Sequence, residues 1–326
     1  MKHLTILVPE GENNLSSIVG PYKIFTRANR YQEERGKKAL FNIQLAGLSR
    51  KIHFYGDLFS VTPHIALSSV KSTDLIIIPS LNHNYKLAIK KNGPMIRWIE
   101  EQYREGAAVA SICTGAFLLA SSGLLNGMRC STHWAAADDF KKMFPEIRVQ
   151  EDKLITDENR ICTNGGAYSF LNLVIYLIEK YYDRQTAIFC AKLFQVEMDR
   201  ESQSPFIIFK GQKLHSDEMI KKAQAYIERK IDERISVEQL SLRFSVSRRN
   251  FDRRFIKATG NTPGEYAQRV KMESAKKMLE TSRKTINQVM YDVGYTDPKA
   301  FREVFRKVTG MSPLEYKHKY NKASVM

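Results

Sequence analysis

The sequence predicts two domains of different class: an α/β sandwich with a mostly parallel sheet, followed by an all-α domain with two helix-turn-helix units. Three observations support this prediction. The chain has 326 residues, and a single hydrophobic core rarely grows that large. Short apolar runs alternate with helical patterns up to about residue 205, and one turn-and-helix pattern occurs twice in the last hundred residues. We expect domains at residues 1–205 and 217–326, joined by a linker at 206–216.

The first domain alternates buried-strand and helical patterns. Apolar runs at Leu4–Val8, Leu75–Pro79 and Ala107–Ser111 are typical of parallel strands that are covered on both faces. Helical patterns lie between them at Ser16–Asn29 and Met95–Arg104. This order predicts a flavodoxin-like sheet with helices on both sides.

The third of these strands runs directly into a helix through Cys113 and Thr114. A side chain at such an elbow lies above the strand ends and beside a helix N-terminus, where open α/β sheets bind ligands and where a thiol pKa tends to fall. His133, twenty residues further on, could reach the same crevice. Cys is also a common small buried residue, so a purely structural role stays open. The candidate pocket residues are Asn13, Asn14, Ser17, Asn82, His83, Cys113, Thr114 and His133.

Basic residues are concentrated in the second part of the chain. The formal net charge is +16, and residues 211–326 hold 25 Lys and Arg against 14 Asp and Glu. This surplus fits a domain that neutralises phosphates, although a lysine-rich soluble surface would also give it. The four cysteines form no Cys-x-x-Cys pair or zinc spacing, and no apolar run is long enough to span a membrane. We expect a cytoplasmic protein without a metal or cofactor.

The second domain is expected to open with a helix capped by Ser216 and then to repeat itself. Each copy begins with a capping box, at Ser236–Gln239 and at Thr285–Gln288. In the second turn, Gly294 suits a reversal of the chain through a positive φ. The second helices are expected to begin after the caps Ser247 and Asp297, so the helix-turn-helix units span about 236–258 and 285–308. The repeated residues are Phe251, Phe255, Gly260, Pro263 and Tyr266, which return as Phe301, Phe305, Gly310, Pro313 and Tyr316.

In each second helix, two Phe residues four apart form a buried stripe, so the residues between them face outward. Arg forks to guanine edges and Asn pairs with adenine, so the first outward face has the chemistry for reading bases. Either helix alone could be a solvated amphipathic helix, but the duplication, the caps and the charge together favour binding to double-stranded promoter DNA. The candidate DNA-binding residues are Arg248, Arg249, Asn250, Asp252, Arg253, Lys299, Arg302, Glu303, Arg306 and Lys307.

Residues 218–320 closely resemble AraC-type transcription regulators. The resemblance rests on Val293-Gly294-Tyr295-Thr296-Asp297-Pro298 followed by Phe301, Phe305, Lys307, Gly310, Ser312-Pro313 and Tyr316. It implies seven helices with two helix-turn-helix units, joined by a long helix at about Pro263–Glu280. It also implies that Arg249, Asp252 and Arg253 face bases in one major groove, and Lys299, Arg302 and Glu303 in the next. Members often have Arg at the position of Glu303, so the second unit either reads less or accepts a hydrogen bond from cytosine.

Residues 3–195 resemble the ThiJ/PfpI branch of the class I glutamine amidotransferase-like fold, in the version that is fused to AraC-type domains. The shared features are Gly20-Pro21, Phe25, Ala28-Asn29, the Cys113 elbow, Thr132-His133-Trp134 and Thr163-Asn164-Gly165-Gly166. Active relatives pair the elbow Cys with an adjacent His or with an acid from the first loop, whereas this chain has Thr114 and Ser17 at these positions. Glu10, Glu12 or Asp74 could replace that acid only in an unusual geometry.

These observations favour a transcription regulator with a non-catalytic pocket for an unidentified small-molecule effector. The resemblance implies a homodimer formed through the first domain and contact with RNA polymerase. The alternative is a cysteine-dependent hydrolase or glyoxalase-like enzyme with an accessory DNA-binding domain. Redox sensing through Cys113 is a third possibility, with Cys130 or Cys162 as the partner thiol.

Overall fold

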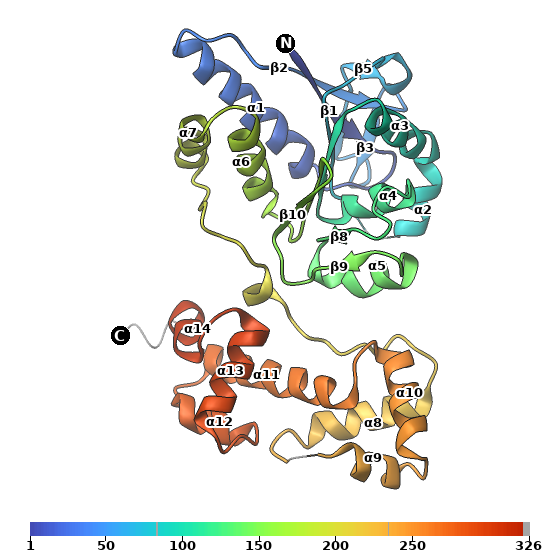
Figure 1. Cartoon of the computed structure of the whole chain (residues 1–326), viewed down its shortest axis with the longest axis vertical. Helices are drawn as coiled ribbons and strands as arrows, with labels where there is room; N and C mark the ends of the chain where they lie inside the picture. The colour runs from blue at the N-terminus through green and yellow to red at the C-terminus, as the bar shows by residue number, and fades with distance from the viewer. Residues whose placement is uncertain (83, 234, 322–326) are drawn as a thin grey trace. The chain divides into compact units, whose positions relative to one another are not determined.

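The computed structural model describes residues 1–82, 84–233 and 235–321 (Figure 1). Two compact units divide the chain, Met1–Gln203 and Ser204–Met326. None of the helices in the described ranges combines the length and the apolar composition that a bilayer crossing needs.

The first unit is built on a seven-stranded sheet with the order β10-β11-β7-β6-β1-β2-β5. All neighbouring strands in it run parallel except β10 and β11, which pair antiparallel at one edge. A hairpin of β3 and β4 and a short pair of β8 and β9 lie outside this sheet. The strands are β1 (Lys2–Val8), β2 (Phe41–Gly47), β3 (Ile52–Phe54), β4 (Phe59–Val61), β5 (Ile65–Ala66), β6 (Leu75–Ile78), β7 (Ala108–Ile112), β8 (Arg129–Cys130), β9 (Arg148–Val149), β10 (Ile155–Glu158) and β11 (Ile161–Asn164).

Helices cover both faces of the sheet, which confirms the predicted α/β sandwich. Figure 1 shows α1, α6 and α7 on one side of the strands and α2, α3 and α4 on the other. Leu4, Ile6 and Val8 of β1 lie in the core under the first set of helices, and Leu7 lies in the core under the second. Alternate side chains of the strand enter different cores, so both of its faces are buried and only Thr5 interrupts the apolar run. The helices of this unit are α1 (Ser16–Glu34), α2 (Tyr85–Lys91), α3 (Gly93–Arg104), α4 (Ala116–Ser121), α5 (Ala137–Met143), α6 (Phe170–Tyr181) and α7 (Arg184–Phe194).

The described part of the second unit holds seven α-helices, as the resemblance implied. Two hydrophobic clusters lie in it, one around Phe251 and Phe255 and one around Phe301 and Phe305. The central helix α11 contributes Tyr266 to the first cluster and Leu279 to the second, so it is shared by both helix-turn-helix units. The helices are α8 (Glu218–Arg229), α9 (Val237–Arg243), α10 (Arg248–Thr259), α11 (Pro263–Thr281), α12 (Ile286–Asp292), α13 (Pro298–Thr309) and α14 (Pro313–Tyr320).

Side-chain caps fix where these helices begin. Both expected capping boxes are present, at Ser236 with Gln239 and at Thr285 with Gln288. The expected cap at Ser216 is wrong by one residue, because the carboxylate of Asp217 accepts from the Ile220 amide and the helix begins at Glu218. A carboxylate is the better cap here, since it also faces the positive end of the helix dipole.

Candidate functional site

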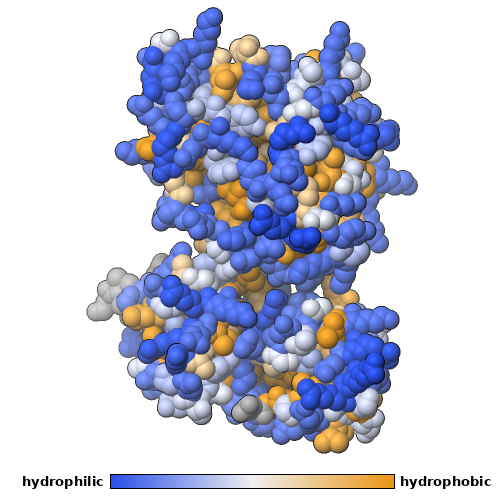
Figure 2. All heavy atoms as spheres, viewed as in Figure 1, coloured by the Kyte–Doolittle hydropathy of each residue, from blue (hydrophilic) through white to orange (hydrophobic). Residues whose placement is uncertain are grey.

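Helix α10 presents its basic side chains on the face opposite its buried stripe. Phe251 and Phe255 are fully buried, whereas Arg249 and Arg253 are exposed. On the face drawn in Figure 2, the hydrophilic colour is dense over the α10 end of the second unit. The helix therefore offers arginine side chains to a partner without disturbing its own core.

The remaining candidates on α10 are partly engaged with their neighbours. Arg248 pairs with Glu238 and lies 3.8 Å from the Asp252 carboxylate. Asn250 accepts from the Arg253 guanidinium at 3.2 Å. These contacts lie at the surface and are therefore weak, so they restrain the side chains little.

Helix α13 presents a matching face in which two charges are reversed. Its five candidates, Lys299, Arg302, Glu303, Arg306 and Lys307, are all exposed. With the fifty-residue offset, Lys299 corresponds to Arg249, Arg302 to Asp252 and Glu303 to Arg253. The two faces therefore carry opposite charges at two adjacent positions.

The structure adds Lys257 to the first face. This exposed lysine lies one turn beyond Arg253, at the repeat position of Lys307. The sequence analysis did not select it, although the same offset pointed to it. With it, the outward stripe of α10 holds three cationic side chains.

The turn before each of these helices reverses the chain through a left-handed residue. Ser245 has φ 53° and Gly294 has φ 71°, so the second turn confirms the predicted positive φ. A Cβ on Gly294 would lie 2.3 Å from the backbone oxygen of Asp232, which only glycine avoids. In the first copy, the Arg254 guanidinium holds α8 on α10 through two bonds of 2.7 and 2.8 Å to Asp217. This Arg254 contact keeps the pKa of the Asp217 carboxyl below its usual range.

The first unit contains a cavity of about 840 Å³ at the carboxyl ends of β6 and β7. Five of the predicted pocket residues line it, namely Asn14, Asn82, Cys113, Thr114 and His133. The further lining residues are Ser80, Leu81, Asn84, Tyr85, Lys86, Ala135, Ala136, Asp139, Lys142, Met143 and Ala167. The cavity lies where the elbow predicted a ligand site.

Cys113 occupies a strained elbow at the floor of this cavity. It has φ 54°, in the left-handed region that a non-glycine residue rarely adopts. A Cβ on Gly115 would lie 2.5 Å from the backbone oxygen of Pro79, so the elbow packs directly on the end of β6. Thr132 donates to the Cys113 carbonyl at 3.0 Å, and Thr114 donates to the Leu81 carbonyl at 2.6 Å. The strained conformation is thus held by neighbours on several sides.

Burial sets the protonation of the elbow. Cys113 is 3% exposed, and burial raises the pKa of its thiol although hydrogen bonds from Ser80 and Thr114 oppose the rise. The expectation of a lowered thiol pKa is therefore wrong, because desolvation outweighs the helix N-terminus. Burial also lowers the pKa of His133, whose Nδ1 accepts from the Ala135 amide at 3.0 Å. Because Nδ1 accepts this hydrogen bond, Nε2 carries the proton of the neutral ring. The imidazole then has no free lone pair with which to take a proton from a thiol.

Of the three other suggested bases, Glu10 does not line the cavity in the described part of the chain, and Glu12 and Asp74 are engaged elsewhere. Both carboxylate oxygens of Glu12 accept from the Tyr55 amide, at 2.9 and 3.1 Å. Asp74 accepts from the His3 amide at 2.7 Å. It precedes β6, so it lies at the amino ends of the parallel strands, whereas Cys113 lies at their carboxyl ends. Neither residue contributes to the cavity in the described part of the chain.

Two predicted pocket residues, Asn13 and Ser17, do not line the cavity and are buried behind the residues that do. Asn13 is fully buried and donates to the carbonyls of Pro9 and Gly11 at 2.7 and 3.0 Å. Ser17 is fully buried as well and accepts from the Ser80 amide at 3.0 Å. The prediction for His83 lies outside the described residues.

One wall of the cavity is aromatic and charged, and its residues were not among those predicted. Tyr85 stacks on Phe117 with ring centroids 3.8 Å apart, and burial raises the pKa of its hydroxyl to about 12. Asp139 and Lys142 of α5 face the same cavity. Tyr85 begins α2, directly after the loop that holds the predicted residue Asn82, whereas no motif marks α5. Among the described residues, no group of His, Cys, Asp and Glu could hold a metal ion.

Comparisons with known proteins agree with both parts of the structure. The sequence matches the DJ-1/PfpI family over residues 9–180 and a helix-turn-helix domain family over residues 240–319. It is similar to the transcriptional regulator GbdR of Pseudomonas aeruginosa, with 22% identity over 88% of this chain and 77% of that protein. It is similar to the regulator CdhR of the same species, with 25% identity over 78% of this chain and 75% of that protein.

Solved structures share the fold of the first unit. An AraC family transcriptional regulator from Pseudomonas putida superposes with a TM-score of 0.51 at 14% identity, over 60% of this chain and all of that chain. DJ-1beta from Drosophila melanogaster also gives a TM-score of 0.51, at 16% identity, over 60% of this chain and 98% of that chain. At these identities the likeness establishes the fold alone.

Proposed function

The chain belongs to the DJ-1/PfpI family and is a helix-turn-helix transcription regulator, and from this premise we propose that a small molecule in the Cys113 cavity controls how α10 and α13 engage promoter DNA. The observation that carries the proposal is the duplicated helix with a buried Phe pair and an exposed basic face. Such a protein acts on DNA in the cytoplasm.

The two helices are proposed to read bases unequally. Arg249 and Arg253 can each fork to a guanine, and Lys257 adds a phosphate contact at the far end of the face. On α13, Glu303 can accept from a cytosine amino group, and Lys307 contacts phosphate. We infer a site in which one half prefers guanine and the other prefers cytosine on the strand that is read.

Alanine substitution at Arg249 or Arg253 tests the base-reading helix. Each substitution removes a bidentate contact and is expected to cost about 1–3 kcal/mol and to relax preference at one base pair. Binding would be measured on duplexes that the unmodified protein enriches from a random pool. Lys23→Ala, which removes a charge from an exposed position on α1, is the control. An unchanged base preference in both arginine variants would show that α10 is not the reader.

A phosphate contact predicts a different result for Lys307→Ala. Affinity should fall about equally for all sequences, and the slope of log affinity against log salt should shrink by about 1. The same measurement on Arg249→Ala separates the two roles. Loss of base preference in Lys307→Ala would contradict the assignment.

The cavity is proposed to bind a ligand without catalysis. Its thiol is buried with a raised pKa, and its imidazole nitrogen Nδ1 already accepts a hydrogen bond. Asn14, Asn82 and Tyr85 offer neutral polar groups to a small molecule. Binding there is proposed to change the presentation of the DNA-binding unit, with a typical coupling of about 1–3 kcal/mol.

Two protein partners complete the proposal. A homodimer formed through the first unit would present two DNA-binding units to one promoter, which raises the specificity that a single unit can reach. Bound regulator would then contact RNA polymerase. Sedimentation of the full chain with and without promoter DNA tests the dimer, which a monomer in both conditions would exclude.

A further inference from the structure

A segment that was expected to be a linker is part of the DNA-binding unit. Residues 204–213, here called the strap, contact the helices that flank the two helix-turn-helix units. Near its start, the carbonyl of Pro205 accepts from the Tyr320 hydroxyl at 3.3 Å. Near its end, the carbonyl of Gln212 accepts from the Gln224 amide at 3.0 Å, and Lys213 pairs with Glu228 at 2.6 Å. The strap thus joins α14, which follows the second helix-turn-helix unit, to α8, which precedes the first.

Between these ends, a buried ion pair on α11 holds the strap. The Lys276 side chain is 4% exposed and lies 2.7 Å from the Glu273 carboxylate. Lys276 also donates to the Ile207 carbonyl at 2.5 Å, and Glu273 accepts from the Phe209 amide at 3.1 Å. Buried charges are costly unless they are paired and fully hydrogen bonded, so the pair and the strap backbone complete each other.

The strap also packs closely on α11 around Phe209. The Phe209 ring meets Tyr266 edge to face, with centroids 5.3 Å apart. Gly211 has φ 70°, and a Cβ on it would lie 2.5 Å from the Tyr266 hydroxyl oxygen. Only glycine lets the strap pass this ring, because any side chain would collide with it.

The repeat extends to the residues that hold the strap. With an offset of 52, Gln224 of α8 corresponds to Lys276 of α11, and both side chains donate to strap carbonyls. The next turn repeats as well, since the Tyr266 hydroxyl donates to Glu228 and the Tyr316 hydroxyl donates to Glu280. The buried positions that share this offset are Ile220 and Met272, Ala223 and Ala275, and Ile227 and Leu279. The helix before each helix-turn-helix unit, α8 or α11, therefore holds the strap through one equivalent position.

We propose that Lys276 and Glu273 are positioning residues for DNA recognition, which hold the strap along α11 and thereby fix α10 and α13 at one separation and rotation. The inference rests on the proposed function. A protein with a fixed pair of reading helices accepts only one spacing between the two halves of its site. One inserted base pair rotates the halves by about 35° relative to each other, since a turn of DNA holds about 10 base pairs.

The test uses the full chain and duplexes that it enriches from a random pool. Affinity is measured on the enriched site and on the same site with one base pair inserted between its halves. The variants are Lys276→Met and the double variant Glu273→Leu/Lys276→Met, which leaves no unpaired buried charge if the single variant fails to fold. Lys277→Met removes the charge of the adjacent exposed lysine and is the matched control.

The unmodified protein and Lys277→Met are expected to bind the inserted site at least about tenfold more weakly than the enriched site. The folded strap variants should lose most of this discrimination and bind the enriched site about tenfold more weakly, while their salt dependence stays unchanged. A folded double variant that discriminates between the spacings as the unmodified protein does would overturn the inference. Failure of the unmodified protein to enrich any sequence would instead overturn the proposed function.

Discussion

Cys113 illustrates how burial decides the chemistry of a single residue. Its position at a strand-to-helix elbow was predicted, whereas the strained backbone there, with a positive φ, was not. The protonation of its thiol could not be predicted from sequence, because it depends on Leu81, Ser80 and other groups brought in by the fold. Desolvation of the thiolate exceeds the stabilisation that these hydrogen bonds supply.

A raised thiol pKa predicts that Cys113 reacts slowly at neutral pH. The thiolate is the nucleophile, so alkylation by iodoacetamide at pH 7 should be at least about tenfold slower than that of a free thiol. The rate should rise only as the pH passes above the ordinary thiol pKa of about 8.5. Mass spectrometry of the native protein measures the rate, and Cys113→Ser assigns the modified peptide. Rapid labelling at pH 7 would mean that the elbow holds a thiolate and would revive the enzyme alternative.

At the scale of elements, the predictable strands were those with both faces covered. The patterns at β1, β6 and β7 were recognised because helices bury alternate side chains on opposite sides. The edge strand β10 (Ile155–Glu158) carries polar residues and was not recognised, since its pairing with β11 is set by tertiary structure. The caps Ser236 and Thr285 were recognised because a capping box is a local pattern. The strap was read as a linker because its contacts to α11 lie more than sixty residues away in sequence.

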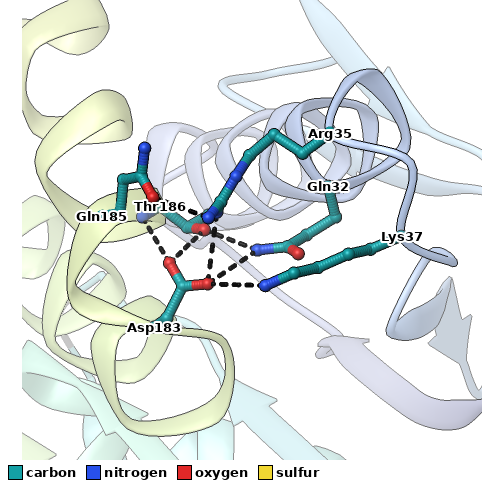
Figure 3. Close-up of polar contacts among 6 residues, drawn as sticks. All are labelled: Gln32, Arg35, Lys37, Asp183, Gln185 and Thr186. Carbon is teal, nitrogen blue, oxygen red and sulfur yellow. Dashed lines mark hydrogen bonds and ion pairs between the residues drawn. The ribbon is translucent and has the colours of Figure 1, made fainter.

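Helices α1 and α7 are joined by a polar cluster around Asp183 (Figure 3). One carboxylate oxygen accepts from Gln32, Arg35 and Lys37 at 3.2–3.3 Å, and the other accepts from the amide and hydroxyl of Thr186 at 2.7 and 2.6 Å. Despite partial burial, which alone would raise it, these bonds hold the pKa of Asp183 well below its usual range. The charged carboxylate is therefore the form that the folded protein stabilises.

Asp183→Asn is expected to lower the free energy of unfolding of the first unit by about 1 kcal/mol at pH 7, because asparagine keeps the helix cap but loses the charge. The folded pKa lies below the unfolded value of about 3.9, so this contribution is complete above that value and is lost as the pH falls through the folded pKa. The difference between variant and unmodified protein should thus be constant from pH 7 to 5 and shrink below pH 4. Urea unfolding followed by tryptophan fluorescence measures it, since Trp98 and Trp134 both lie in the first unit. Asp152→Asn is the exposed control, and a difference that grows in acid would contradict the sign.

Two glycines of the second unit make a matched test of the turn before α13. Gly294→Ala places a Cβ 2.3 Å from the Asp232 carbonyl oxygen at a positive φ, so we expect a loss of at least about 2 kcal/mol. Gly264→Ala lies in the first turn of α11, where a Cβ meets nothing within 4 Å, and should be neutral or stabilising by up to about 1 kcal/mol. Thermal unfolding followed by circular dichroism measures both. Equal melting temperatures in the two variants would show that the turn tolerates a side chain.

At the scale of the whole molecule, the repeat in the sequence predicts the two DNA-reading helices, whereas most of the cavity is formed by residues that only the fold brings together. The two DNA-reading helices were predictable because their pattern occurs twice in the sequence. The position of Lys307 in the second copy identifies Lys257 in the first through the fifty-residue offset. The cavity was predictable only at Cys113 and the loops nearest to it. Asp139 and Lys142 in its wall come from α5, which no motif marks, and only the fold brings them to the ends of β6 and β7.

If the cavity controls DNA binding, its ligand and the DNA must affect each other equally. A compound that binds the folded first unit raises its melting temperature, so a screen of small metabolites by thermal shift can identify one. Its Kd, measured with and without a saturating enriched duplex, should change by the same factor by which the compound changes the Kd for DNA, typically about 5–150-fold. Asn82→Leu alters a polar wall of the cavity and should abolish both effects, whereas Asn42→Leu on the exposed side of β2 should leave both intact. A compound whose Kd is the same with and without DNA would show that the cavity is not coupled to α10 and α13. One that acts equally on Asn82→Leu would bind at another site.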